Sequence, residues 1–202
     1  MNIIGLGQCG CNIAKCFEQH SQYDIYYINT EEVKSKGYLF PEQEYYVGDK
    51  KVNIGKTYII PKQESHEEYE KNCPDLSKFL KKIKGETLFF LGASGVLSGS
   101  VLKILEYIKD SKLSVILVVP DVELLSETAY LQNRAVFFIL QEYARSGLLE
   151  KLLLLDNTIL EETIPDLTIL TRYDKINEVI CSSINMLNVL DNQKTIMKTS
   201  AK

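Results

Sequence analysis

The sequence lacks the features that mark proteins that span membranes, leave the cell or bind nucleic acids. No apolar run approaches the length of a membrane span, and the first residues lack the basic flank and apolar stretch of a secretory signal. There are 23 Lys and Arg residues against 27 Asp and Glu residues, which gives a formal net charge of −4 and no basic footprint. We therefore expect neither a nucleic acid nor a membrane among its direct partners.

Cysteine and histidine are too few and too scattered to indicate a disulfide framework or a metal site. The two histidines stand apart from each other and from the cysteines. The cysteines are odd in number and irregularly spaced: Cys9, Cys11, Cys16, Cys73 and Cys181. This pattern predicts reduced thiols in a cytoplasmic protein and no metal ion held by a cluster of protein side chains.

The overall composition is ordinary for a globular protein. The 202 residues are 45% hydrophobic and 25% charged, and the chain shows no internal repeat and no low-complexity linker. A chain of this length can bury a substantial core. We expect one full-sized domain.

Strand-like and helix-like segments alternate along the chain. Aliphatic and aromatic runs predict strands at residues 2–4, 24–28, 87–91, 113–119 and 152–155, with weaker ones at 45–47 and 58–60. Amphipathic patterns predict helices at residues 9–20, 75–84, 100–109 and 167–190, and a long helix that ends at Ser146 before Gly147. Aliphatic strands separated by helices indicate an α/β fold, a Rossmann-like parallel sheet with helices on both faces.

The first loop is rich in glycine. Gly5, Gly7 and Gly10 follow the first predicted strand and lead directly into a helix. Glycine reaches φ > 0 and leaves the backbone open to a ligand. A helix that begins there adds free N–H groups and the positive end of its dipole, which together bind phosphate. We therefore predict a nucleotide phosphate site, with a tight turn that holds no ligand as the alternative.

This loop leaves the type of nucleotide open. Its glycines spell G-x-G-x-x-G, and Glu31 and Glu32 follow at about the 20-residue distance of a ribose-binding carboxylate, as in an NAD-binding oxidoreductase domain. The segment Gly7-Gln8-Cys9-Gly10 is also closely similar to the Gly-Gln-Cys-Gly of tubulins, whose loop holds the phosphates of GTP.

Four loops fall at the carboxyl ends of predicted strands, at residues 5–10, 29–31, 92–99 and 120–121. Parallel α/β sheets bind ligands beyond these ends, so we expect the four loops to meet at one rim and form the site. Residues 33–64 are polar and weakly patterned, and we expect loops there that lie over the site.

Two glycine loops, each between a strand and a helix, are similar to the GTPase domain of the tubulin/FtsZ family, and the resemblance extends over most of the chain. Residues 5–12 look like the family's opening motif, Ile28-Asn29-Thr30-Glu31 resembles its Asn-Thr-Asp/Glu, and residues 92–99 fall at its glycine-rich signature loop. Tyr173 and Asn177, which share a helix face at this spacing, resemble the start of its central helix.

The resemblance implies that the chain binds GTP or GDP together with Mg²⁺, which would have few direct protein ligands. It implies phosphates at both glycine loops, Asn29 and Glu31 near the ribose or phosphates, and Arg134 and Asn157 at the sugar. Tyr173 would stack on the base, and Asn177 would hydrogen-bond the edge of the base. The full set of implied nucleotide contacts is Gly7, Gln8, Cys9, Cys11, Asn12, Asn29, Glu31, Gly92, Ser94, Gly95, Val96, Leu97, Ser98, Gly99, Arg134, Asn157, Tyr173 and Asn177.

Two departures from the family pattern bear on activity. In residues 93–99 several glycines and the central threonine of the signature loop are missing, and Val96 and Leu97 add bulk beside the phosphates. Asp191 is the one carboxylate in residues 188–192, where the family usually has two that activate water on the GTP of a neighbouring subunit. The resemblance thus implies GTP-dependent self-assembly into filaments with Asp191 as the catalytic residue. A degenerate, non-hydrolysing assembly module and an NAD-binding oxidoreductase domain remain as alternatives.

The resemblance also implies a division of the chain. Residues 1–190 would form the nucleotide-binding domain and end in the central helix, and residues 191–202 would begin a second domain or form a tail that needs its partner. Composition and divergent loops are compatible with a phage or plasmid relative, such as the TubZ and PhuZ groups. A phage-encoded protein would act in the cytoplasm of its host.

Overall fold

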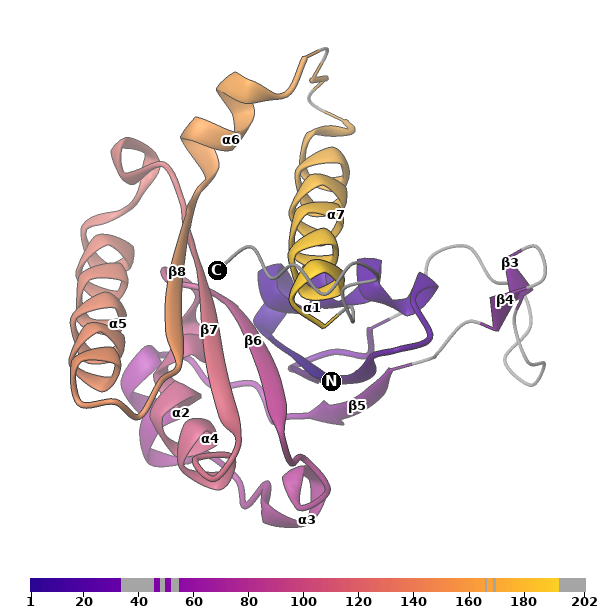
Figure 1. Ribbon diagram of the computed structural model, residues 1–202. Coiled ribbons are helices and arrows are strands. Elements are labelled where there is room, and N and C mark those ends of the chain that lie inside the picture. Colours follow the sequence, from indigo (N-terminus) through magenta and orange to yellow (C-terminus); the bar gives the residue numbers. More distant parts are fainter. Residues whose placement is uncertain (34–45, 48–49, 52–54, 166, 169, 193–202) are drawn as a thin grey trace.

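The computed structural model describes residues 1–33, 46–47, 50–51, 55–165, 167–168 and 170–192, and a six-stranded sheet forms its centre (Figure 1). The strands lie in the order β5-β2-β1-β6-β7-β8, each parallel to its neighbours. Their bounds are β1 Asn2–Leu6, β2 Asp24–Asn29, β5 Lys56–Ile59, β6 Glu86–Gly92, β7 Lys112–Val119 and β8 Lys151–Asp156. The short strands β3 (Tyr46–Val47) and β4 (Lys50–Lys51) pair antiparallel in a separate sheet.

Helices cover both faces of the six-stranded sheet. One face carries α1 (Gly7–Cys16) and α7 (Arg172–Asn192). The other face carries α2 (His66–Lys71), α3 (Ser77–Leu80), α4 (Val101–Tyr107) and α5 (Glu127–Arg145). Helix α6 (Asn157–Thr163) connects β8 to α7, and 3-10 turns lie at Phe17–Gln19, Val96–Ser100 and Val122–Leu124. This arrangement confirms the predicted α/β fold.

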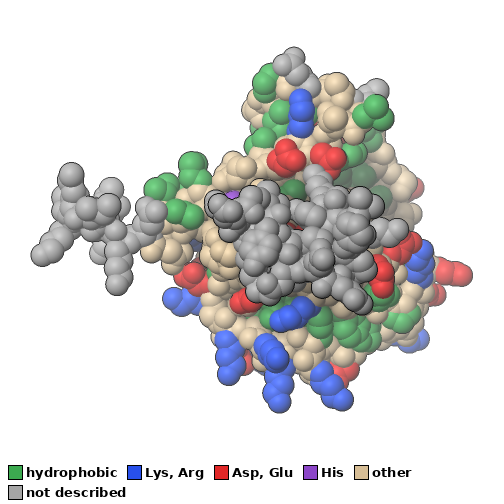
Figure 2. Space-filling model, turned by 90° about the vertical axis from the view of Figure 1, so that its right-hand side faces the viewer, with side chains coloured by type: hydrophobic (Ala, Val, Ile, Leu, Met, Phe, Trp, Pro, Cys, Tyr) green, Lys and Arg blue, Asp and Glu red, His purple; other side chains and the backbone are tan. Residues whose placement is uncertain are grey.

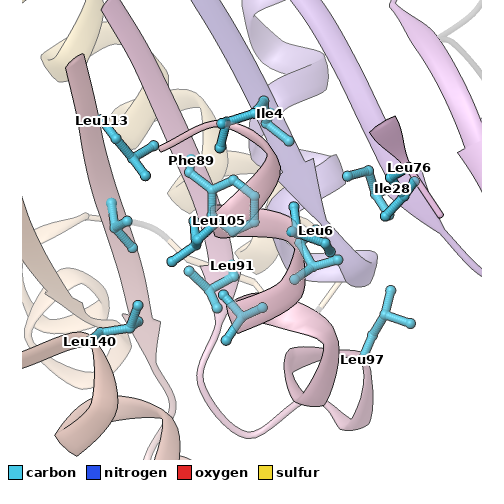
Figure 3. Close-up of a cluster of buried hydrophobic side chains, with 14 of the residues drawn as sticks. Ile4, Leu6, Ile28, Leu76, Phe89, Leu91, Leu97, Leu105, Leu113 and Leu140 are labelled. Atoms are coloured by element: carbon cyan, nitrogen blue, oxygen red, sulfur yellow. The ribbon is translucent and has the colours of Figure 1, made fainter. Parts of the chain in front are cut away.

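Two apolar clusters, one on each face of the sheet, hold the layers together. A single strand contributes to both clusters, because successive residues of a strand point to opposite faces. Ile4 and Leu6 of β1 belong to the cluster beneath α3, α4 and α5, part of which Figure 3 shows. Ile3, between Asn2 and Ile4 in the same strand, packs in the cluster beneath α1 and α7. Burial on both faces explains why β1, β2, β6 and β7 are almost continuously apolar.

Two of the three glycines in the first loop serve packing rather than a turn. A Cβ on Gly10 would lie 2.1 Å from the carbonyl oxygen of Phe90 in β6, and a Cβ on Gly5 would lie 2.6 Å from the carbonyl oxygen of Gly10. Helix α1 therefore packs backbone against backbone on β1 and β6. Gly7, by contrast, has φ +68°, the left-handed conformation that favours glycine.

The strand predictions are confirmed, with bounds that differ by one or two residues where the strand is fully described. The helix ends were less accurate. The helix predicted at 9–20 begins at Gly7 and gives way to a 3-10 turn after Cys16, and the one predicted at 100–109 begins with the 3-10 turn Val96–Ser100 and ends at Tyr107. Gly147 has φ +78° and follows Ser146, the residue that caps the C-terminal end of α5, as predicted for a glycine just past a helix end.

Local turns shortened two other predicted helices. The helix predicted at 75–84 reduces to α3, because the chain turns where the Ile83 N–H donates to the Leu80 carbonyl. The helix predicted at 167–190 begins at Arg172, because a turn closed by the Thr171 N–H and the Thr168 carbonyl precedes it. Helices α2 and α6 were not predicted, since they are too short to show a clear helical period.

The loops expected over the rim, at residues 33–64, lie largely outside the described residues. Within the described ranges, no helix is both long and apolar enough to cross a membrane. Figure 2 shows acidic and basic side chains together on one face of the molecule, in keeping with the small net charge.

Candidate functional site

A cavity of about 380 Å³ opens at the carboxyl ends of β1, β6 and β7, between the start of α1, the loop after β6 and the start of α7. This volume is typical of a small-molecule site. Of the residues implied to contact nucleotide, the cavity is lined by Gly7, Gln8, Cys9, Asn12, Gly92, Ser94, Gly95, Leu97, Ser98, Asn157, Tyr173 and Asn177. Segments far apart in the sequence thus converge at the predicted rim.

The N-terminus of α1 forms one wall of this cavity. The residue before the helix, Leu6, makes no capping hydrogen bond through its side chain, and the first turn contains no acidic residue. The first N–H groups of a helix have no partner within the helix, so here neither a side-chain cap nor a nearby carboxylate satisfies them. Together with the helix dipole they make this wall suited to an anion.

A row of side-chain amides runs from β2 to this wall. The Asn29 Nδ2 donates to Gln8 Oε1 at 3.5 Å, and the Gln8 Nε2 donates to Asn12 Oδ1 at 3.0 Å. Gln8 and Asn12 line the cavity, whereas Asn29 is buried at the end of β2 and does not. Asn29 therefore orients Gln8 instead of facing the cavity itself.

The second loop uses several of its own donors internally. The Ser98 N–H and hydroxyl both donate to the Gly95 carbonyl, at 2.9 and 2.6 Å, and the Gly95 N–H donates to the Gly92 carbonyl at 3.5 Å. Leu97 is buried, and its Cβ lies 3.8 Å from the position that a Cβ on Gly7 would occupy. This loop offers a ligand fewer free donors than the start of α1.

The start of α7 forms the opposite wall. Tyr173 is 62% exposed and lines the cavity together with Asn177. The Arg172 guanidinium lies 5.5 Å from the centre of the Tyr173 ring and also pairs with Glu161 of α6. An aromatic face and a carboxamide on one helix face can stack on a planar base and hydrogen-bond its edge.

Among the residues that the structure describes, no side chain that lines the cavity carries a charge at neutral pH. The lining residues include no Asp, Glu, Lys, Arg or His, and burial raises the pKa of the Cys9 thiol to about 11, so it stays protonated. A bound phosphate would therefore depend on backbone N–H groups and on a cation that accompanies it. In the described part of the chain, no group of three or more His, Cys, Asp or Glu could hold a metal ion. The amide oxygens of Gln8 and Asn12 fit Mg²⁺ that is bound mainly through phosphate and water.

Six residues implied to contact nucleotide do not line the cavity: Cys11, Asn29, Glu31, Val96, Gly99 and Arg134. The Cys11 thiol is buried beneath α1, where it donates to the Gly5 carbonyl at 3.2 Å. A Cβ on Gly99 would lie 2.2 Å from the His66 carbonyl oxygen, so Gly99 serves packing against α2.

Three further residues of this group, Val96, Arg134 and Glu31, also lie outside the cavity. Val96 is 44% exposed outside the cavity. The Arg134 guanidinium lies over the rings of Tyr130 and Phe138 on its own helix, 5.8 and 5.7 Å from their centres. Glu31 pairs with Lys62, with 2.6 Å between Oε1 and Nζ, and both side chains are exposed. The side chains of these three residues do not line the cavity, and their implied contact with a nucleotide stays a prediction.

Asp191 lies at the opposite end of the molecule. It is exposed near the C-terminal end of α7 and lines a different cavity, of about 310 Å³, together with Glu86 and Lys112 at the amino ends of β6 and β7. The first cavity is at the carboxyl ends of the same strands. Asp191 is therefore separated from the cavity of its own chain by the length of the sheet.

The set of implied nucleotide contacts leaves out the apolar part of the lining, although Leu6 and Pro120 belong to loops that were expected at the rim. The omitted residues are Leu6, Leu91, Val118, Pro120, Ile176 and Ile180. Leu6 ends β1, Leu91 and Val118 are the next-to-last residues of β6 and β7, and Pro120 directly follows β7. Ile176 and Ile180 lie one helical turn from Tyr173 and Asn177. These lining residues could have been predicted from their positions near the ends of the predicted strands and one helical turn from Tyr173 and Asn177.

No protein-family model and no curated protein sequence matches this chain. A solved structure does match: an FtsZ from M. jannaschii, described as an empty dimer, aligns with a TM-score of 0.70 at 14% sequence identity. The alignment covers 99% of this chain and 57% of the FtsZ chain, so the chain spans a little over half of that length. The similarity shows that the chain has an FtsZ-like fold.

Proposed function

We propose that this chain is a guanine-nucleotide-binding protein of the tubulin/FtsZ family. The observation that carries the proposal is the cavity at the carboxyl ends of the strands, with the uncapped start of α1 on one side and Tyr173 and Asn177 on the other. The distribution of groups suits a nucleotide, which is anionic at one end and planar and polar at the other. The FtsZ-like fold supports the same assignment.

In the proposed complex, the N–H groups at the start of α1 bind the phosphates. Asn157 approaches the sugar, Tyr173 stacks on guanine, and Asn177 hydrogen-bonds the edge of the base. Mg²⁺ accompanies the phosphates and neutralises part of their charge. Gln8 and Asn12 hold that end of the ligand through their side-chain amides.

The position of Asp191 supports a proposal about assembly and hydrolysis. A carboxylate at the far end of the sheet can reach a nucleotide only in another subunit stacked end to end. We propose that such stacking forms GTP-dependent filaments and that Asp191 then acts as a general base on the GTP of the neighbour. The matched FtsZ is described as a dimer, which is consistent with self-association.

The chain covers a little over half of the matched FtsZ, and we propose that it corresponds to the nucleotide-binding domain. Residues 1–190 would form this domain up to the last turns of α7, and residues 191–202 would lead into a second domain or form a partner-dependent tail. Residues 193–202 lie outside the described residues. A relationship to the phage and plasmid TubZ and PhuZ groups stays a prediction.

One alternative is favoured by a specific observation. The internal hydrogen bonds of Gly95 and Ser98 leave the second loop with few donors for phosphate, as expected for a module that binds nucleotide weakly and does not hydrolyse it. The NAD-binding alternative has less support, because Glu31 pairs with Lys62 and does not line the cavity.

Identification of bound nucleotide tests the proposal directly. The freshly purified protein would be heat-denatured and the released small molecules identified by chromatography, followed by calorimetric titration of the emptied protein with GTP, GDP and NAD⁺. We expect released GDP or GTP near one per chain and a saturable guanine-nucleotide site. NAD⁺ binding would overturn the family assignment, and a protein that binds none of the three would be the degenerate module.

A further inference from the structure

The ion pair between Glu31 and Lys62 lies beside the cavity rather than in it. Glu31 follows β2 and Lys62 follows β5, so both lie at the same carboxyl-end rim as the cavity. Their side chains hydrogen-bond to each other at 2.6 Å and are both well exposed. An exposed ion pair contributes little to stability, so it can exchange partners readily.

The order of the strands indicates which end of a nucleotide would point toward this pair. Asn157 follows β8, and together with Tyr173 and Asn177 it would hold the base and sugar. The phosphate-binding start of α1 follows β1. In the order β5-β2-β1-β6-β7-β8, a nucleotide laid from β8 to β1 continues toward β2 and then β5. Its terminal phosphate would therefore extend toward Glu31 and Lys62.

Two hydrogen bonds and a short stretch of backbone lead from the cavity to Lys62. Gln8 lines the cavity and accepts a hydrogen bond from Asn29 at the end of β2. The Asn29 carbonyl accepts a hydrogen bond from the Ile60 N–H at 2.8 Å, and Lys62 follows two residues later. Strands β1 and β5 are two strand spacings apart, about 10 Å. The long, flexible side chain of Lys62 spans much of this distance.

A cationic side chain near the cavity would offset the negative charge of bound phosphates. No described side chain that lines the cavity is charged, whereas each added phosphate brings further negative charge. Lys62 is a point charge with three donors that suits a phosphate oxygen. In the described structure this charge is neutralised by Glu31, whose pKa is lowered by the hydrogen bond from Lys62.

We propose that the Glu31–Lys62 ion pair senses the terminal phosphate of a nucleoside triphosphate. Lys62 leaves Glu31 and binds the third phosphate, whereas a diphosphate is too short to reach it and leaves the ion pair in place. Lys62 thereby sets the preference for triphosphate over diphosphate, and the released Glu31 changes the charge at the rim when triphosphate is bound. This inference rests on the proposed nucleotide site and adds to it the basis of discrimination between the two nucleotides.

Calorimetric titration with GDP and with a non-hydrolysable GTP analogue, both with Mg²⁺, tests the proposal. Lys62→Met should weaken binding of the triphosphate analogue about tenfold and leave the affinity for GDP nearly unchanged, since the lost contact is a charge-assisted hydrogen bond. Lys56→Met is the matched control, because Lys56 begins the same strand at its other end. It should change neither affinity.

A second variant separates sensing from a general effect of charge. Glu31→Gln removes the competing partner of Lys62 and should tighten binding of the triphosphate analogue without changing that of GDP. Equal weakening of both nucleotides by Lys62→Met, no change in either, or weaker triphosphate binding in Glu31→Gln would overturn the sensor. A wild-type protein that binds neither nucleotide would instead overturn the proposed function itself.

Discussion

At the scale of single residues, the direction of a side chain decides which residues of the predicted loops line the cavity. The residues of the first motif alternate between the cavity and the core as α1 turns: Gln8, Cys9 and Asn12 line the cavity, while Gly10 and Cys11 face the sheet. A resemblance between sequences transfers a position along the chain but not the direction of a side chain. The helical period, applied from Gly7 onward, would have separated these two groups.

The first prediction concerns Asn177, whose carboxamide faces the cavity from α7. Asn177→Ala should weaken GTP binding about tenfold, because it removes hydrogen bonds to the edge of the base and leaves the fold intact. Binding is measured by calorimetric titration. Asn192→Ala, near the other end of the same helix, is the control and should bind GTP like the wild type. An unchanged dissociation constant in Asn177→Ala would remove this residue from the site.

The second prediction concerns Gly10, which allows α1 to lie against β6. Gly10→Ala should lower the free energy of unfolding by roughly 3 kcal/mol or more, since the added methyl group meets the rigid Phe90 carbonyl. Gly85→Ala is the matched control, because Gly85 has φ +78° but nothing within 4 Å of an added Cβ. It should cost only about 1–2 kcal/mol. Urea unfolding compares the two, and equal losses would show that the contact is relieved without cost.

At the scale of elements, the strands could be predicted and the helix ends could not. Strands such as β7 are continuous aliphatic runs, because they are buried on both faces, and burial leaves a local signal. The ends of α3 and α7 depend on backbone turns at Leu80 and Thr168, which have no comparable signal in hydropathy. The second glycine loop was found by its place between β6 and α4, but its internal hydrogen bonds were not predictable from composition.

One buried acid joins three elements and makes stability depend on pH. Glu18, in the 3-10 turn after α1, accepts hydrogen bonds from the Tyr27 hydroxyl of β2 at 2.8 Å and from the Gly55 N–H at 3.4 Å, just before β5. Burial is the main influence on Glu18 and raises the pKa of its carboxyl group above the ordinary value. The folded chain therefore binds this proton more tightly than the unfolded chain does.

The third prediction follows from the sign of this shift. The stabilising contribution of Glu18 is fully present below its ordinary pKa and is lost as the pH rises through the raised value. Relative to Glu18→Gln, the wild type should therefore gain stability as the pH is lowered from 7 toward 5. Urea unfolding of both proteins over this range measures the difference. A difference that is independent of pH would contradict the raised pKa.

At the scale of the whole molecule, the two ends of the sheet carry different chemistry. The carboxyl ends of the strands hold the cavity, and the amino ends hold Asp191 beside Glu86 and Lys112. The sequence indicated most of the polar residues of the cavity and Asp191, but not Glu86 or Lys112. The separation of Asp191 from the cavity could be predicted only by combining the parallel sheet with the direction of α7, which begins at the cavity and ends at the far edge.

The fourth prediction tests this separation. If hydrolysis requires Asp191 from a neighbouring subunit, turnover per subunit should rise with protein concentration. Asp191→Asn should abolish that rise and retain GTP binding, because a general base contributes orders of magnitude to the rate. Phosphate release measures turnover, and Asp110→Asn, in an exposed turn, is the control. Turnover that is independent of concentration in the wild type would contradict hydrolysis between subunits.

The backbone contact between α1 and β6 limits how far the geometry of the cavity depends on the side chains around it. Because no side chain lies between the Gly10 position and Phe90, the distance from the start of α1 to the end of β6 is set by main-chain atoms alone. Most other side chains around the cavity can then be exchanged over evolutionary time without moving its walls. A shared fold at 14% identity is expected if a glycine at this position keeps the backbone geometry while the surrounding residues change.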